Sequence, residues 1–144
     1  MVAAGGSYGG YLASILLGRE HPFKALVAHA AVYNWYTQIG SDFGFSKSRF
    51  PEFWEDPSIF QQSSPHFGAG KFNTPTLVIH GQQDFRVPVN HGIELFHTLK
   101  KRGVQTKLIY YPNENHWVLK PQNSIFWYQQ VIDWVERYAA PGGR

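Results

Sequence analysis

The chain has 144 residues, of which 43% are hydrophobic and 17% aromatic, so it can bury the core of one domain. Its formal net charge is only +3 and its basic residues are scattered, so we expect no nucleic-acid partner and no membrane partner. The sequence has no cysteine, which excludes disulfides and cysteine-ligated zinc, and it has no long apolar window or recognisable leader, which favours a cytoplasmic protein.

Short apolar runs alternate with helical patterns, which is typical of a parallel β-sheet covered by helices. In chain order we expect strands at Val2–Ala4, Ala25–Ala30, Thr76–His80 and residues 106–112, with helices at about Tyr8–Leu17, in residues 90–103 and at about Gln122–Tyr138. Residues 33–73 are an aromatic-rich insertion without clear strands, in which we expect short helices, for example around Phe53–Gln61. Connections of this length are usually functional or lid-like.

Apolar residues recur at helical spacing in the last two predicted helices. The stripe in residues 90–103 consists of Gly92, Leu95, Phe96 and Leu99. Gly103 follows this stripe as a helix stop. The stripe in the last helix consists of Ile125, Tyr128, Ile132 and Val135.

Gly5, Ser7 and Gly9 form the pattern G-x-S-x-G between the first predicted strand and helix. In that context the pattern predicts a strained turn, with glycines on both sides so that strand and helix can pass each other. Ser7 would then lie at the carboxyl edge of the sheet, above a helix N-terminus that favours developing negative charge. Taken alone, the pattern is equally compatible with a glycine-rich turn and an N-capping serine.

An acid and a base follow Ser7 in the order that such a turn predicts. Asp84 lies four residues after His80, and His116 lies five residues after Tyr111, each just past a predicted strand. Asp84 would fix the imidazole tautomer, while His116 would take the proton of Ser7 and return it to the leaving group. Singly, Asp84 and His116 could be ordinary loop residues, but together with Ser7 they favour a catalytic triad.

Other titratable residues give weaker signals. Glu114 is a competing acid, but it lies two residues from His116 on the same loop, so we expect it to be solvated. The remaining histidines lack a spacing such as H-E-x-x-H, so we expect no metal and no other cofactor. His29 and His80 end predicted strands, where we expect them to satisfy buried hydrogen bonds.

Three stretches together resemble the prolyl oligopeptidase family of serine peptidases, which includes dipeptidyl and acylaminoacyl peptidases. They are "GGSYGGY", "SPHFGAGKFNTPTLVIHGQQDFRVP" and "YYPNENHW". The chain resembles the C-terminal part of the catalytic domain of that family from Val2 to about Tyr138. This resemblance implies that Ser7, Asp84 and His116 form the triad, and that the backbone N–H of Tyr8 is an oxyanion donor. It also implies that Trp35 lines the substrate pocket, although ordinary core packing of Trp35 is an equally good reading.

The resemblance also implies a truncated α/β-hydrolase fold, with about four mainly parallel strands and helices on both faces. Residues 1–144 would form a partial peptidase catalytic domain, without the segment that supplies the second oxyanion donor in that family. The strand at Val2–Gly5 would become an exposed edge. Because such edges seek partners, we expect a homo-oligomer that pairs through it.

Three functions remain open. The first is a serine-type peptidase that acts on peptides or acyl-peptides through an acyl-Ser7 intermediate. The second is a carboxylesterase, because small esters demand less from a weakened oxyanion hole. The third is a non-catalytic remnant or a subunit that complements another chain. A small-molecule binding module that uses the aromatic segment has weaker support.

Overall fold

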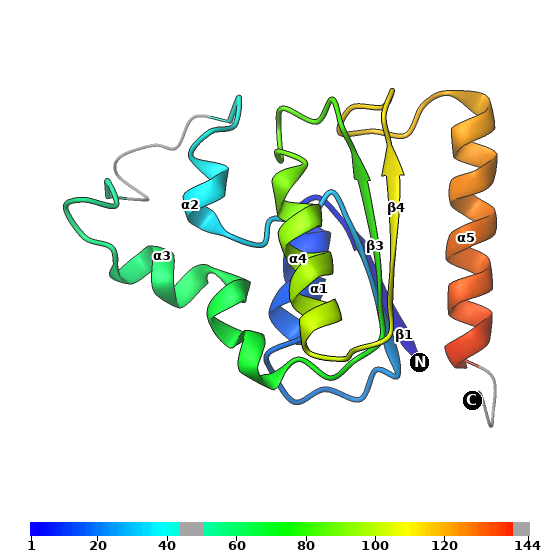
Figure 1. Ribbon diagram of the computed structural model, residues 1–144, viewed down its shortest axis with the longest axis horizontal. Coiled ribbons are helices and arrows are strands. Elements are labelled where there is room, and N and C mark those ends of the chain that lie inside the picture. Colours follow the sequence, from blue (N-terminus) through cyan, green and yellow to red (C-terminus); the bar gives the residue numbers. More distant parts are fainter. Residues whose placement is uncertain (44–50, 140–144) are drawn as a thin grey trace.

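A computed structural model describes residues 1–43 and 51–139 and places helices on both sides of one sheet (Figure 1). The strands are β1 (Val2–Gly6), β2 (Ala25–His29), β3 (Thr76–Gly81) and β4 (Thr106–Tyr111). The helices are α1 (Tyr8–Leu16), α2 (Trp35–Gln38), α3 (Ser58–Ser63), the 3-10 helix η1 (Pro65–Lys71), α4 (Asn90–Lys101) and α5 (Pro121–Ala139). The predicted α/β fold class is confirmed, and every predicted strand and long helix is present.

The four strands are all parallel and lie in the order β1-β2-β3-β4. The carboxyl ends of parallel strands meet at one edge of a sheet, which is where ligands bind in open α/β folds. Ser7 directly follows β1, Asp84 follows β3 and His116 follows β4, so the topology brings all three residues to that edge.

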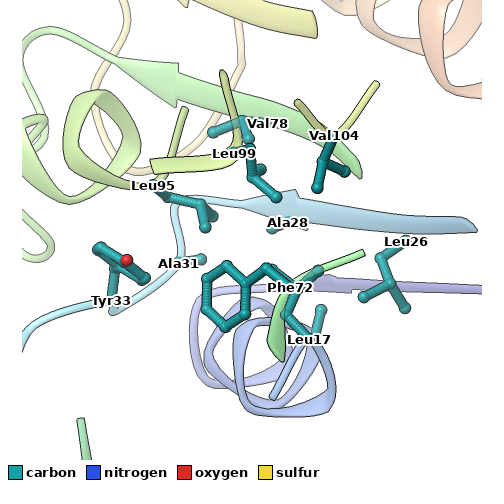
Figure 2. Close-up of a cluster of buried hydrophobic side chains, with 11 residues drawn as sticks. Leu17, Leu26, Ala28, Ala31, Tyr33, Phe72, Val78, Leu95, Leu99 and Val104 are labelled. Carbon is teal, nitrogen blue, oxygen red and sulfur yellow. The ribbon is translucent and has the colours of Figure 1, made fainter. Parts of the chain in front are cut away.

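Two apolar clusters hold the helices against the sheet. Leu26 and Ala28 of β2 belong to the cluster under α1 and α4, and Figure 2 shows Leu95 and Leu99 of α4 in the same cluster. The alternate residues of β2, Ala25 and Val27, belong to the cluster under α5. Because β2 is buried on both faces, its first four residues are a continuous apolar run rather than an alternating one.

The predicted apolar stripe of α5 is not the face that packs on the sheet. Ile125, Tyr128 and Ile132 are all more than half exposed. The face toward the sheet instead carries Trp127, Val131, Trp134 and Tyr138. Both rows have helical spacing, so periodicity alone cannot choose between them. Although α5 has 19 residues, neither it nor any other helix in the described residues is long and apolar enough to cross a membrane.

The insertion contributes α2, α3 and η1, and its residues 44–50 lie outside the described part of the chain. The side chain of Asn34 accepts a hydrogen bond from the N–H of Tyr36 and so caps α2. The helix expected around Phe53–Gln61 begins only at Ser58, which follows Pro57. Of these helices, α2 follows the carboxyl end of β2, whereas η1 packs on α1 and leads into the start of β3.

β1 lies at the edge of the described sheet and pairs only with β2 there. Val2 and Ala3 of β1 are neither fully buried nor fully exposed. No partner chain is present to test pairing between two copies. The predicted homo-oligomer through this strand therefore stays a prediction.

Candidate active site

Ser7 occupies a sharp turn between β1 and α1. Its backbone angles are φ 56° and ψ −117°, a conformation that costs a non-glycine residue free energy. Two hydrogen bonds hold it there: the N–H of Ser7 donates to the carbonyl of His29 (2.9 Å), and the carbonyl of Ser7 accepts from the N–H of Tyr11 (2.9 Å). Strain held in place by the surrounding structure is typical of a nucleophile elbow.

The glycines around Ser7 are not equally constrained. A Cβ at Gly5 would lie 2.2 Å from the carbonyl oxygen of Gly9, and a Cβ at Gly10 would lie 2.6 Å from the carbonyl oxygen of His29. A Cβ at Gly9 would meet nothing within 4 Å in the described structure. The close approach of strand and helix therefore requires glycine at positions 5 and 10, one residue later on the helix than the sequence pattern predicts.

Ser7, His116 and Asp84 lie within hydrogen-bond reach of one another. The Nε2 atom of His116 is 2.9 Å from Oγ of Ser7, and its Nδ1 atom is 2.7 Å from Oδ2 of Asp84. The imidazole thus bridges the hydroxyl and the carboxylate with one ring nitrogen each. This is the geometry of a nucleophile, a base and an orienting acid.

Asp84 is 2% exposed, and both of its carboxylate oxygens accept hydrogen bonds. Oδ1 accepts from the backbone N–H groups of Arg86 (3.0 Å) and Val87 (2.8 Å), while Oδ2 faces His116. Burial alone would raise the pKa of Asp84, but hydrogen bonds from His116, His80 and Val87 outweigh it and hold that pKa well below its usual range. Asp84 is therefore ionised and can only accept hydrogen bonds.

The charge of Asp84 decides which nitrogen of His116 carries the proton. Because a carboxylate only accepts, Nδ1 of His116 must donate to Asp84. In the neutral ring this leaves the lone pair of Nε2 facing Ser7, so the serine hydroxyl donates to Nε2. A general base needs this tautomer, because the lone pair must point at the proton that is removed.

A pocket of about 610 Å³ opens above these residues and is lined by Ser7, His116 and Trp35, among others. The indole of Trp35 donates to the carbonyl of Ser63 (3.1 Å), and the hydroxyl of Tyr11 donates to the same carbonyl (2.8 Å). Their rings lie 5.5 Å apart in an edge-on arrangement. Trp35 is thus fixed by contacts from α1 and α3 while part of it faces the pocket.

Tyr8 lines the same pocket and is the first residue of α1. The N–H groups in the first turn of a helix have no acceptor within that helix. The N–H of Tyr8 belongs to the residue directly after Ser7, so it lies at the positive end of α1. This is the position that stabilises an oxyanion in hydrolases with a nucleophile elbow.

Residues 1–142 match the Prolyl oligopeptidase family. The chain belongs to this family.

Curated relatives from fungi agree with that membership. The chain is 37% identical over 144 residues to the probable dipeptidyl-peptidase 5 of Aspergillus clavatus, with 96% of this chain covered. It is 38% identical over 149 residues to the probable dipeptidyl-peptidase 5 of Aspergillus niger, with 99% covered. Each comparison covers 20% of the relative, so the chain spans about a fifth of the length of these proteins.

Solved structures show the same fold. The uncomplexed acylaminoacyl peptidase of Pyrococcus horikoshii matches with a TM-score of 0.88 at 26% identity, covering 95% of this chain and 24% of that one. The dipeptidyl peptidase 4 of Porphyromonas gingivalis matches with a TM-score of 0.83 at 22% identity, covering 93% of this chain and 19% of that one. The four parallel strands are therefore part of an α/β-hydrolase fold.

In this member of the prolyl oligopeptidase family, Glu114 is buried, so the expectation of a solvated side chain is wrong. Glu114 is 3% exposed and accepts from the N–H groups of Leu119 (3.1 Å) and Lys120 (3.1 Å) and from the side-chain amide of Asn123 (2.6 Å). Burial would raise the pKa of Glu114, but these hydrogen bonds lower it. Glu114 thus fastens the His116 loop to the start of α5 and is not a rival partner for the imidazole.

Sequence reasoning missed several residues of the pocket wall. Besides the predicted residues, the pocket is lined by Asp42, Phe43, Phe85, Arg86 and Trp117. The Nε atom of Arg86 is 2.7 Å from Oδ1 of Asp42, and this ion pair ties the insertion to the loop of the acid. The residues after Asp84 are Phe85 and Arg86, and the residue after His116 is Trp117. Their proximity in sequence to the predicted triad could have identified them as pocket residues.

Two histidines near the site make stability depend on pH. Burial lowers the pKa of His29 to about 4 and that of His91 to about 3. His91 must be neutral in the fold, because its Nδ1 accepts from the N–H groups of Tyr33 (3.0 Å) and Asn34 (3.3 Å). Histidines in the unfolded chain take up protons below about pH 6.5, so the free energy of unfolding falls between pH 6.5 and the folded pKa values.

We therefore expect acidification to pH 5 to cost about 2 kcal/mol for each of these histidines, lowering Tm by more than about 5 °C relative to pH 7. Circular dichroism melts at pH 7, 6 and 5 measure the effect. His91→Asn keeps an acceptor for the two N–H groups but cannot titrate, so it should flatten the pH dependence. Asp84 and Glu114 have lowered pKa values, so they lose their contribution only at lower pH. Equal Tm values at pH 7 and pH 5 would contradict the prediction.

Proposed function

We propose that the chain is a serine hydrolase that transfers an acyl group to water, with Ser7 as nucleophile, His116 as general base and Asp84 as orienting acid. The observation that carries this proposal is the pair of hydrogen bonds made by His116, at 2.9 Å to Ser7 and 2.7 Å to Asp84. Membership of the prolyl oligopeptidase family supports it independently. The strained backbone of Ser7 supports it as well.

The proposed chemistry has two halves. The oxygen of Ser7 attacks the substrate carbonyl while its proton passes to Nε2 of His116, and Asp84 stabilises the imidazolium that results. The tetrahedral oxyanion accepts a hydrogen bond from the N–H of Tyr8. The intermediate then expels the leaving group, which takes the proton from His116, and an acyl-Ser7 remains. Water repeats the sequence with His116 as base, which releases the acid and restores Ser7.

We infer peptides or acyl-peptides as the substrate class. The relatives named dipeptidyl-peptidase 5 and acylaminoacyl peptidase act on such compounds by name. The pocket supports the same class, because the aromatic side chains of Trp35, Phe85 and Trp117 offer apolar walls beside Ser7. Such walls suit the side chain of an amino acid next to the scissile bond.

Small esters are a second candidate substrate class. The observation that favours them is the oxyanion site, for which we identify one donor, the N–H of Tyr8, among the described residues. Loss of one oxyanion donor typically costs about 10²–10³ in turnover. An ester suffers less from such a loss than an amide, because an alkoxide or phenolate leaves more readily than an amine.

The proposal is tested with a fluorophosphonate probe, which labels serine hydroxyls activated by a neighbouring base. The folded chain should be labelled on the peptide that contains Ser7, as mass spectrometry would show, and the heat-denatured chain should not. Rates on p-nitrophenyl butyrate, Gly-Pro p-nitroanilide and N-acetylalanine p-nitroanilide then separate the two substrate classes. A folded chain that resists the probe would sink the hydrolase proposal and favour a non-catalytic chain.

A further inference from the structure

His80 is a buried histidine that the proposed chemistry does not use. It lies in β3, four residues before Asp84, and its side chain has no exposed surface. It does not line the pocket, so it cannot touch a substrate there. Its Nε2 atom is 2.8 Å from the carbonyl oxygen of Val87 and 3.5 Å from Oδ2 of Asp84.

These contacts fix the protonation of His80. The carbonyl of Val87 can only accept, so Nε2 of His80 must carry a hydrogen. Nδ1 is buried and has no hydrogen-bond partner in the described structure, so a second proton there would be a buried donor without an acceptor. The Nε2–H group of His80 therefore points at the loop of the acid.

The first turn of α4 holds the ring of His80 in that position. A Cβ at Gly92 would lie 2.7 Å from Nδ1, 3.0 Å from Cβ and 3.1 Å from Cγ of His80. The ring thus fills the space that a side chain at Gly92 would need. Because these atoms lie near the root of the side chain, the ring cannot swing aside without moving β3 or α4.

Asp84, Val87 and His80 are linked to one another by polar contacts. Val87 donates its N–H to Oδ1 of Asp84 (2.8 Å) and offers its carbonyl to His80 (2.8 Å). The N–H and the carbonyl of Val87 are thereby both held, and the carboxylate can rotate only by breaking its bonds from Arg86 and Val87. Oδ2 is left facing the Nδ1 atom of His116.

We propose that His80 is a positioning residue for Asp84, a role that rests on the proposed function. The N–H of His80 holds the loop from Asp84 to Val87 in place, so that Oδ2 of Asp84 meets His116. Without this N–H, the carbonyl of Val87 is a buried acceptor without a donor, and the loop relaxes. The Nε2 atom of His80 also lies 3.5 Å from Oδ2 of Asp84, where its N–H helps to keep the pKa of Asp84 low against burial.

The direct test compares His80→Leu with His80→Gln. Leucine fills the space but donates nothing, whereas the amide N–H of glutamine reaches about as far as Nε2. At metal sites, mutation of a residue that hydrogen-bonds to a ligand and orients it typically costs about 10–100-fold in activity. His80 would orient Asp84 in a comparable way, so we expect a loss of about that size in the fluorophosphonate labelling rate of His80→Leu. His80→Gln should recover most of the rate. His97→Leu, which removes an exposed histidine from α4, is the matched control and should leave the rate unchanged.

The pH profile of labelling separates positioning from general damage. A displaced carboxylate no longer stabilises the imidazolium of His116, so the acid limb of the profile should move to lower pH in His80→Leu. His29 and His91 also face this region, but their lowered pKa values keep them neutral across the limb, and Arg86 is paired with Asp42. A variant that merely loses folded protein should lose more of its rate at acid pH, where the fold is less stable, so its acid limb should move the opposite way, to higher pH.

Gly92→Ala tests the same inference from the opposite side, should His80→Leu fail to fold. Alanine suits a helix better than glycine, so α4 should stay helical, but its methyl group should shift α4 or β3 and so separate His80 from Val87. We expect a slower rate and the same shift of the acid limb. Gly70→Ala, at a glycine with open space around it, is the control. Wild-type rates and profiles in His80→Leu and Gly92→Ala would overturn this inference alone, whereas an unlabelled wild-type chain would overturn the proposed function.

Discussion

Replacing Ser7 with alanine is expected to abolish both probe labelling and hydrolysis while the fold persists. In the proposed reaction the hydroxyl of Ser7 attacks the carbonyl, and within the described residues this hydroxyl hydrogen-bonds to His116. In serine hydrolases whose triad acts as a unit, loss of the nucleophile costs about 10⁶ in turnover. Rates on p-nitrophenyl butyrate and on the preferred p-nitroanilide, each measured with wild type and Ser7→Ala, check the prediction.

Ser14→Ala is the matched control for Ser7→Ala. Ser14 lies in the next turns of α1, is fully buried, and its hydroxyl has no hydrogen-bond partner in the part of the chain that the structure describes. Its removal should leave activity unchanged and the helix at least as stable, because an unsatisfied buried hydroxyl is lost and alanine favours helix. Equal hydrolysis by Ser7→Ala and wild type would remove Ser7 from the chemistry.

The order of strands and helices could be predicted because the sheet is parallel and covered on both faces. Residues 25–28 and 77–79 are continuous apolar runs because both of their faces are buried, and a helix follows each of the four strands. The orientation of α5 could not be predicted. Tryptophan, tyrosine, phenylalanine and isoleucine occupy most of its circumference, so only contact with the sheet selects Trp127 and Trp134 as the buried side.

The three residues of the triad could be predicted because each follows a strand at a spacing that places it on one sheet edge. Glu114 and His80 could not be assigned in this way, because their roles depend on burial and on hydrogen bonds to groups five to nine residues further along the chain. Glu114 looks like a loop carboxylate in the sequence, yet Leu119 and Asn123 surround it. The residues that support the site are therefore polar side chains whose local sequence gives no sign of that role.

Glu114 and His80 both help to position the imidazole of His116, through the loops that follow two neighbouring strands. Glu114 fastens the loop after β4 that carries His116, and His80 fastens the loop after β3 that carries Asp84. Gly81 lets these two loops approach, because a Cβ there would lie 2.4 Å from the carbonyl oxygen of Asn115. The geometry of the triad is thus fixed by backbone contacts between neighbouring loops as well as by the triad side chains.

Asp84→Asn is expected to lower activity by about 10⁴ without unfolding the chain. Oδ1 of Asp84 accepts from two backbone N–H groups, those of Arg86 and Val87, so the carbonyl oxygen of asparagine must take that position. The amide NH₂ then faces Nδ1 of His116 and donates to it. His116 is forced into the other tautomer, with its hydrogen on Nε2 pointing at Ser7, and it can no longer accept the serine proton.

Glu114→Gln is the matched control, because it changes the other buried carboxylate near His116. The single oxygen of glutamine can accept from Lys120 and Asn123, but its NH₂ group then faces the N–H of Leu119, so the chain should lose stability. His116 should still keep its tautomer and most of its activity, because its partner Asp84 is unchanged. Steady-state rates and thermal melts of both variants distinguish a tautomer effect from a loosened loop. If Asp84→Asn retained activity within tenfold of wild type, Asp84 could not be the residue that orients the imidazole.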